Sequence, residues 1–348
     1  MTTLASLNSL DDAAFAAALN GIYEHSPWIA ERAASRRPFA TLAALKLALQ
    51  EVVDAASEDE RLALLRAHPE LAGKAAIAGE LTEESTGEQA ASGLNQYSAG
   101  EYACLQQLNG EYNDKFGFPF ILAVKGPTGR GLTRSAIIDT FARRLKNARA
   151  GELAEALRQV HRIAEIRLNV LLDVVPSMGA QVMDWCETIG EWSDAETGLT
   201  CAYLTPAHRR TAARIVNWMI DAGMDVHIDA VGNVVGRYAA LDVNAKSLMT
   251  GSHYDTVING GKYDGRLGIL LPIAVAAHLH ARGERLPFHL DVIGFAEEEG
   301  VRFPLPYIGS AALAGRFEPQ WLDRCDAAGV TLRTALQAAG LDPAATAQ

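Results

Sequence analysis

The sequence predicts an all-α helical domain in its N-terminal half and an α/β domain in its C-terminal half. Three observations predict this arrangement. The chain has 348 residues, which is more than one average domain. Apolar residues recur at helical spacing up to about residue 173, and strand-like apolar runs appear only after it. We therefore expect domains at residues 1–173 and 181–348, joined by a linker at 174–180 that contains Pro176 and Gly179.

Most helices predicted in the N-terminal half begin at a serine or threonine that can cap the first turn. Three of these starts have a glutamate three residues later, which is the signature of a capping box. One of the helices should end near His68, because Pro69 disfavours helical geometry at the residue before it. Two longer helices should follow, at about residues 135–148 and 152–174. The expected capping residues are Ser9, Thr41, Ser57, Ser85 and Ser98.

In the C-terminal half, the pattern changes to alternating strands and helices. Such alternation is typical of an α/β layer architecture. The last strand, at residues 288–296, is nearly continuous in apolar residues, which is typical of a strand buried on both faces. The predicted helices lie at about residues 206–222 and 265–281, and the other strands at about 225–231, 233–239 and 247–251.

The composition excludes several classes of protein. A net charge of −11 repels phosphate backbones, so we expect no nucleic-acid partner. The longest apolar run, residues 267–279, is shorter than the roughly 20 residues that span a bilayer, so we expect no membrane partner. The four cysteines form no CxxC pair, which favours a reducing compartment. We expect a soluble, cytoplasmic protein that forms a homo-oligomer.

Four residues of the N-terminal half can carry chemistry. His68, at a helix end, can be partly exposed and can exchange protons near neutral pH. It can equally cap the helix by bonding a terminal carbonyl. Glu88 is either a functional carboxylate or the return arm of a capping box with Ser85. Arg167 is either a ligand for an anion or a surface charge, and Arg162 is a nearby alternative.

Four segments then identify a family. HPELAGK, ESTGEQAASGL, YNDKFGFPFILAVKG and RIAEIRL, in this order, resemble 2-oxo-4-hydroxy-4-carboxy-5-ureidoimidazoline (OHCU) decarboxylase over residues 5–172. The resemblance implies a cofactor-free carboxy-lyase that converts the small molecule OHCU to (S)-allantoin in urate degradation, a branch of purine catabolism. It makes His68 and Glu88 catalytic. It also implies a set of substrate-binding residues: Pro69, Ser85, Gln89, Phe120, Ile121 and Arg167, with Phe118 and Pro119 in the same loop as Phe120.

This reaction makes sense without a cofactor, because the substrate contains its own electron sink. Its carboxylate leaves as carbon dioxide and pushes electrons into an adjacent ring C=N bond. The enzyme must orient the carboxylate and deliver one proton to one face of the ring. We expect His68 to be the general acid, since its ordinary pKa suits that task. Glu88 would hold the 4-hydroxyl or set the His68 tautomer, and Arg167 would pair with a substrate oxygen.

A second group of candidate residues lies in the C-terminal half. His253 follows a predicted strand, and Asp255 could orient its ring, as carboxylates often do in metal sites. Asp264 stands in a Gly-rich turn, and Glu298 and Glu299 end a predicted strand. Such imidazole and carboxylate ligands suit Zn²⁺ or Mn²⁺. The alternative is a solvated acidic turn.

The motifs GSHYDT, GGKYDG and EEEGVRF resemble the dinuclear-metal amidohydrolases that include allantoate amidohydrolase and N-carbamoyl-L-amino-acid hydrolase. The resemblance covers residues 178–340, the first part of that family's domain, and implies a partial fold of the zinc-exopeptidase type. It makes His253, Asp264 and Glu299 metal ligands and Glu298 the general base.

The amidohydrolase family uses two further histidine ligands, and no histidine follows His289 here. We therefore keep three alternatives for this half. It can be part of a longer bifunctional fusion with a hydrolase that acts on allantoate or another ureido compound. It can be a catalytically inactive remnant, or it can be a non-catalytic scaffold.

Overall fold

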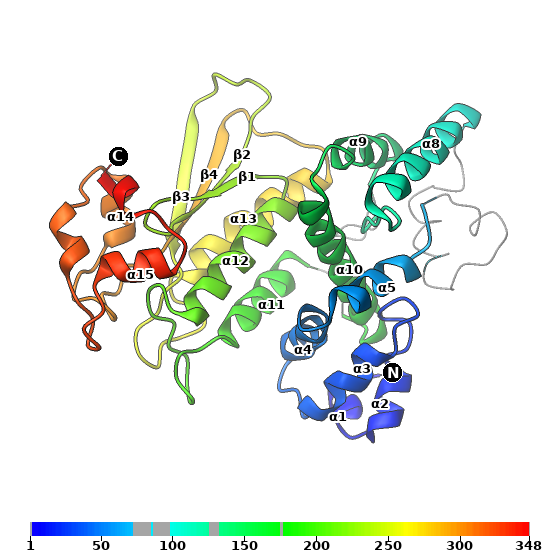
Figure 1. Cartoon of the computed structure of the whole chain (residues 1–348), viewed down its shortest axis with the longest axis horizontal. Coiled ribbons are helices and arrows are strands. Elements are labelled where there is room, and N and C mark those ends of the chain that lie inside the picture. Colours follow the sequence, from blue (N-terminus) through cyan, green and yellow to red (C-terminus); the bar gives the residue numbers. More distant parts are fainter. Residues whose placement is uncertain (1, 72–84, 86–97, 125–131, 175–176, 348) are drawn as a thin grey trace. The chain divides into compact units, whose positions relative to one another are not determined.

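The computed structural model describes residues 2–71, 85, 98–124, 132–174 and 177–347 (Figure 1). It divides into two compact units, Met1–Pro176 and Ser177–Gln348, and each is described here by itself. Within the described residues, no helix combines the length and the apolar character needed to cross a membrane.

The first unit is helical, and its described residues contain no strand, as the sequence predicts. The longest helix, α10, runs along the unit and carries Arg167. A short 3-10 helix at Ala34–Arg36 follows α3. The α-helices are α1 Leu4–Asn8, α2 Asp12–Ala18, α3 Trp28–Ala33, α4 Leu42–Asp54, α5 Glu58–Ala67, α8 Ala99–Phe116, α9 Arg134–Arg144 and α10 Arg149–Leu171.

The capping residues explain where these helices begin. Thr41 caps α4, and reciprocal capping boxes open α5 at Ser57 and α8 at Ser98, so these three predicted starts are confirmed. The start predicted at Ser9 is wrong, because α2 begins at Asp12, where the carboxylate of Asp11 accepts the hydrogen bond that a cap must accept.

Aromatic rings fill the core of the first unit beside the segment 118–124. The ring of Phe120 stacks on Phe141, with ring centres 3.8 Å apart. Tyr112 contacts both rings edge-on. All three side chains are fully buried, so they hold this irregular segment against α8 and α9.

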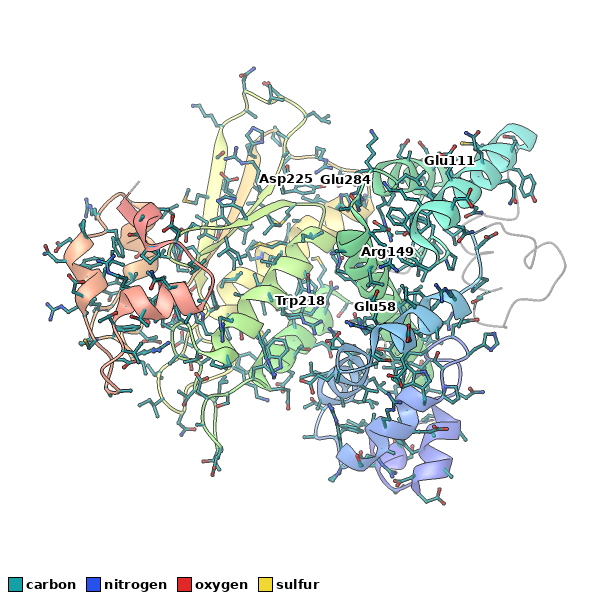
Figure 2. All side chains as sticks on the ribbon, in the orientation of Figure 1. Glu58, Glu111, Arg149, Trp218, Asp225 and Glu284 are labelled. Atoms are coloured by element: carbon teal, nitrogen blue, oxygen red, sulfur yellow. The ribbon has the colours of Figure 1, made fainter. Side chains whose placement is uncertain are left out.

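Two ion pairs of the first unit differ sharply in burial. Arg144 and Glu152 are both inaccessible to solvent and lie 2.5 Å apart. A second nitrogen of Arg144 donates to the carbonyl oxygen of Ile121 at 2.7 Å, so this pair also fixes the segment 118–124. Glu58 and Arg149, labelled in Figure 2, form an exposed pair at 3.3 Å.

The second unit contains a mixed sheet of four strands with helices around it (Figure 1). The strand order is β1-β2-β4-β3, with antiparallel pairing of β1 to β2 and of β2 to β4, and parallel pairing of β3 to β4. The predicted strand at 288–296 is confirmed as β4, and its internal position explains why it is almost entirely buried. The strands are β1 Asp225–Ile228, β2 Val234–Tyr238, β3 Ser247–His253 and β4 His289–Phe295.

The helices α12 and α13 pack against the sheet, and α11 packs on α13. α11 begins inside the segment predicted as a linker, because the Ser177 hydroxyl caps it. Short 3-10 helices lie at Pro319–Asp323 and Pro343–Ala347. The α-helices are α11 Met178–Gly190, α12 Pro206–Asp221, α13 Arg266–Ala281, α14 Ile308–Leu313 and α15 Leu332–Ala338.

The parallel pairing of β3 and β4 positions the candidate metal ligands. His253 at the end of β3 is in register with Phe295 at the end of β4. The carboxyl ends of parallel strands meet at one edge of a sheet. The residues that follow β4, including Glu298 and Glu299, therefore emerge beside His253.

Candidate active site and candidate metal centre

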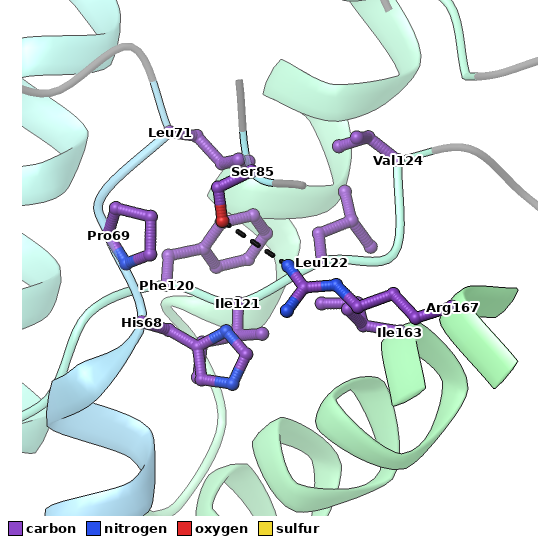
Figure 3. A pocket seen from close by; sticks show the side chains of 10 residues that line it. All are labelled: His68, Pro69, Leu71, Ser85, Phe120, Ile121, Leu122, Val124, Ile163 and Arg167. Atoms are coloured by element: carbon purple, nitrogen blue, oxygen red, sulfur yellow. Dashed lines mark hydrogen bonds between the residues drawn. The ribbon is translucent and has the colours of Figure 1, made fainter. Parts of the chain in front are cut away.

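A pocket of about 360 Å³, including its open mouth, lies among three elements of the first unit (Figure 3). The end of α5, the segment 118–124 and α10 contribute its walls, together with Ser85. The residues that line it are His68, Pro69, Leu71, Ser85, Phe120, Ile121, Leu122, Val124, Ile163 and Arg167.

Six of the predicted residues therefore line one pocket, although they are up to 99 residues apart in the chain (from 68 to 167). The alternative ligand Arg162 is not among them, and neither are Phe118 and Pro119. Glu88 and Gln89 lie outside the described residues.

The environment of His68 differs from the expected one. α5 ends at Ala67, and His68 takes an extended backbone conformation before Pro69, as predicted. Its side chain is only 7% exposed, so the expectation of a partly exposed imidazole with an ordinary pKa is wrong. Burial lowers the pKa of His68 to about 4, against the opposing charge of Glu24 and with the help of Arg167 and His25. The ring is neutral at pH 7, and its Nε2 has no hydrogen-bond partner among the described residues.

Arg167 reaches the pocket from α10 and is held by the predicted site residue Ser85 and by two groups that no sequence motif indicates, Glu24 and the backbone of Gly21. Its Nη1 donates to the Glu24 carboxylate and to the carbonyl oxygen of Gly21, each at 2.7 Å. Its Nη2 donates to the Ser85 hydroxyl at 3.3 Å, the dashed line in Figure 3. Glu24 lies in a loop between α2 and α3 without any recognisable motif, so no signal in the sequence indicated it.

The pocket wall at residues 118–124 is fixed through its backbone. The Ile121 carbonyl accepts from Arg144, and the Ala123 N–H donates to the Gln159 side chain at 3.0 Å. The guanidinium of Arg144 also lies over the Phe120 ring, 4.6 Å from its centre. These contacts make the wall a rigid part of the pocket.

The chemistry of the pocket suits a small anion. A guanidinium supplies positive charge and hydrogen-bond donors, and a neutral imidazole can accept and return a proton. Most of the other lining side chains are apolar and exclude water. The exclusion of water strengthens the attraction between the guanidinium and an anion and the hydrogen bonds of the imidazole.

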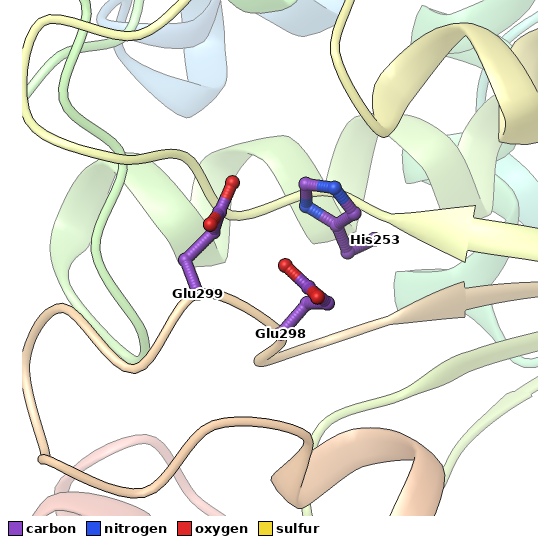
Figure 4. Close-up of side chains that lie close together, drawn as sticks. All are labelled: His253, Glu298 and Glu299. Atoms are coloured by element: carbon purple, nitrogen blue, oxygen red, sulfur yellow. The ribbon is translucent and has the colours of Figure 1, made fainter.

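The candidate metal ligands of the second unit are also brought together in part. Ligand atoms of His253, Glu298 and Glu299 all lie within 4.8 Å of one another (Figure 4). Asp264 is not in this group. The next residue, Gly265, has a φ of +66°, and an added Cβ there would lie 2.5 Å from the His253 ring. The turn that carries Asp264 therefore passes directly against His253.

Asp255 organises this cluster, as the sequence suggests. Its carboxylate lies 3.3 Å from Nδ1 of His253 and accepts hydrogen bonds from the backbone N–H groups of Glu298 and Glu299. It is almost completely buried. This arrangement fixes the ring and leaves Nε2 of His253 for a ligand bond.

The electrostatics of the cluster favour a cation. Burial lowers the pKa of His253, but the hydrogen bond and charge of Asp255 outweigh burial and raise it to about 9. Burial and the charge of Glu298 raise the pKa of Glu299. Burial and Asp255 raise the pKa of the adjacent Glu297 to about 9. One imidazole and two crowded carboxylates are a donor set that fits Zn²⁺ or Mn²⁺.

Comparison with known proteins identifies the family to which the pocket of the first unit belongs. A sequence model of the family described as OHCU decarboxylase matches residues 8–169. The 2-oxo-4-hydroxy-4-carboxy-5-ureidoimidazoline decarboxylase of Haloferax volcanii is 43% identical over 166 residues, which cover 48% of this chain and 94% of that protein. This chain belongs to the OHCU decarboxylase family. In this decarboxylase, the matched region contains the whole pocket around His68 and Arg167.

The decarboxylase is also similar to two other kinds of protein. The probable allantoate deiminase of rice (Oryza sativa) is 40% identical over 161 residues, or 46% of this chain and 33% of that protein. The chain thus spans about a third of the length of this relative. The uric acid degradation bifunctional protein PucL of Bacillus subtilis is 37% identical over 240 residues, or 68% of this chain and 45% of that protein.

Proposed function

We propose that the first unit decarboxylates OHCU to (S)-allantoin in urate degradation. The pocket that joins His68, Ser85 and Arg167 carries this proposal, because it combines an anion ligand with a proton-transfer group. Membership of the OHCU decarboxylase family supports it. We assign the decarboxylase domain to residues 1–173 and the segment between the domains to 174–180.

The substrate carboxylate binds next to the guanidinium of Arg167, with the ring against Phe120 and Ile121. Pro69, Ser85 and Gln89 complete the contacts. When carbon dioxide leaves, its bonding electrons move into the ring C=N bond and form an enol-like intermediate. The apolar walls favour this step, because they do not stabilise the carboxylate that is lost.

The buried, neutral state of His68 gives it a specific role in the next step. The 4-hydroxyl becomes the carbonyl of allantoin and loses a proton, while the neighbouring ring carbon gains one. A neutral imidazole accepts the first proton and returns it to the carbon on one face, and the ring nitrogen takes a second proton from water. Glu88 holds the 4-hydroxyl or sets the His68 tautomer.

The test is circular dichroism on freshly prepared OHCU with the full chain. The enzyme should produce optically active (S)-allantoin, whereas His68→Ala should leave only the racemate of the uncatalysed reaction. Full rate and full enantiomeric excess in His68→Ala would refute the proposed role of His68.

A second function rests on the cluster of His253, Glu298 and Glu299. We propose that residues 181–348 correspond to part of an amidohydrolase-like domain of the zinc-exopeptidase type. His253 and Glu299 would hold Zn²⁺ or Mn²⁺, and Glu298 would be the base. Asp264, the third ligand that the resemblance implies, lies outside the cluster and would have to move towards it to bind the ion. Such an ion, when bound, activates water for hydrolysis of a ureido compound such as allantoate.

Elemental analysis, paired with ammonia release from allantoate, tests this second proposal. Stoichiometric metal and turnover would support a hydrolase. Metal without turnover would favour the scaffold, and the absence of both would favour the inactive remnant. The expectations of a homo-oligomer, of a cytoplasmic location and of a decarboxylase without a cofactor stay predictions.

A further inference from the structure

The loop between α2 and α3 places a buried carboxylate directly behind the decarboxylase pocket. Glu24 is only 2% exposed and does not line the pocket itself. On the basis of the proposed function, we propose that Glu24 is a positioning residue of the decarboxylase. It holds Arg167 and Ser85 as one unit and limits the positive charge that Arg167 presents to the substrate.

The hydrogen bonds among these three residues form a closed triangle. Arg167 Nη1 donates to Glu24 at 2.7 Å, and Arg167 Nη2 donates to the Ser85 hydroxyl at 3.3 Å. The Ser85 hydroxyl lies 3.2 Å from both carboxylate oxygens of Glu24. Because each member contacts the other two, removing Glu24 releases both residues that the substrate meets.

Contacts to α10 hold the loop that carries Glu24. The hydroxyl of Tyr23 lies 2.9 Å from Nδ1 of His161 on α10. The carbonyl of Gly21 accepts from Arg167, as described above. Immediately after Glu24, His25 has a φ of 45°, a left-handed conformation that costs energy for a residue other than glycine. The backbone just before Glu24 is therefore anchored to α10, the helix that carries Arg167.

The charge of Glu24 matters for the reaction. The substrate carboxylate loses its charge when it leaves as carbon dioxide. An arginine without a counter-ion would bind the substrate more tightly than the transition state and would slow the reaction. Glu24 offsets this charge while keeping the guanidinium in place, so the pocket binds the ground state less strongly.

The test compares Glu24→Gln and Glu24→Asp in the full chain, with circular dichroism on fresh OHCU as the assay. Glu24→Gln keeps the size of the side chain but removes its charge and one of its two acceptor oxygens, so its hydrogen bonds to Arg167 and Ser85 loosen. Both KM and kcat should fall, kcat by about 100-fold, the loss that a small misplacement of Arg167 and Ser85 can cause. Glu24→Asp keeps the charge and should recover part of kcat. Glu51→Gln is the matched control, because Glu51 pairs with Arg36 at 2.8 Å on the surface. It should behave as wild type.

A double-mutant cycle with Arg167→Gln keeps the test decisive if Glu24→Gln folds poorly, since the double variant leaves no unpaired buried charge. In the Arg167→Gln background, Glu24→Gln should change kcat by less than about 2-fold. Additive effects would overturn the inference, as would wild-type kinetics or a raised KM alone in Glu24→Gln. If the wild-type chain forms no (S)-allantoin, the proposed function fails instead.

Discussion

Two histidines in this chain have opposite environments. His68 lies in a mostly apolar pocket, where burial lowers its pKa to about 4. His253 is also sheltered from water, but the carboxylate of Asp255 lies 3.3 Å from its ring and raises its pKa to about 9. The difference arises from the neighbours, because desolvation acts on both rings in the same direction.

The comparison indicates which chemistry each region can support. A neutral imidazole can accept a proton from a substrate and return it without any ion. An imidazole among crowded carboxylates belongs to a site whose negative charge is best balanced by a cation. The first region resembles an acid–base site built from protein side chains, and the second resembles a set of metal ligands.

The largest effect is expected from a substitution of His68 itself. His68→Gln should lower the rate of decarboxylation by about 10²- to 10⁴-fold, since the proton-transfer group is lost. His253→Ala is the control and should leave the rate unchanged, because His253 belongs to the other unit. Circular dichroism of the allantoin formed measures both variants. Equal losses in the two variants would contradict the separation of the two sites.

The next prediction tests what keeps the first pocket rigid. Glu152→Gln removes the closer carboxylate partner of the buried Arg144 and leaves Glu155, at 3.9 Å, so it should lower the free energy of unfolding by about 3 kcal/mol. Glu58→Gln removes an exposed partner of Arg149 and should cost less than about 1 kcal/mol. Urea unfolding of both variants measures the difference. A loss of similar size in both would show that burial of the pair is unimportant.

The lowered pKa of His68 can be tested through its effect on the pH dependence of the free energy of unfolding. Its pKa is lowered on folding, from 6.5 to about 4, so the unfolded chain binds more protons in this window. The contribution of His68 to the free energy of unfolding is therefore fully present above about pH 6.5. It decreases by about 3 kcal/mol as the pH falls through 4. His68→Gln should lack this loss. The difference between wild type and variant isolates it, because His208, with a pKa also lowered to about 4 by burial, is present in both. If the free energy of unfolding of wild type and of His68→Gln had the same pH dependence, His68 would not be buried in its neutral form.

The smallest expected effect concerns the second region. Excess Zn²⁺ or Mn²⁺ should raise the melting temperature of the second unit by about 5 °C, if the free ion is near 100 times its Kd. His253→Ala should abolish this shift. Treatment with a chelator should leave decarboxylation unchanged, because the chemistry proposed for the pocket around His68 uses protein groups alone. Loss of decarboxylation on chelation would contradict this prediction.

Much of the fold could be predicted because local signals decide it. Ser57 and Ser98 each have a glutamate three residues later, and both mark true helix starts. The burial of His68 could not be predicted, because it depends on how α10 and the segment 118–124 pack around it. The role of Glu24 could not be predicted for the same reason, because its partner Arg167 is 143 residues away in the chain.

In the second unit, the sequence motifs predicted the position of a candidate ligand correctly where the residue lies at the end of a strand. His253 and Glu299 come together because β3 and β4 are parallel neighbours. Asp264 lies in a turn whose path no periodic pattern specifies, and it falls outside the group. Ser177 caps α11 although its neighbours Pro176 and Gly179 are residue types typical of a linker.

Because Gly265 lies so close to His253, two glycines of the turn before α13 differ in whether a side chain can replace their hydrogen. Gly261 has open space around it among the described residues, so many side chains fit there. At Gly265, any side chain would collide with the imidazole and would also oppose the backbone conformation. A side chain introduced into this turn is thus tolerated at Gly261 and excluded at Gly265.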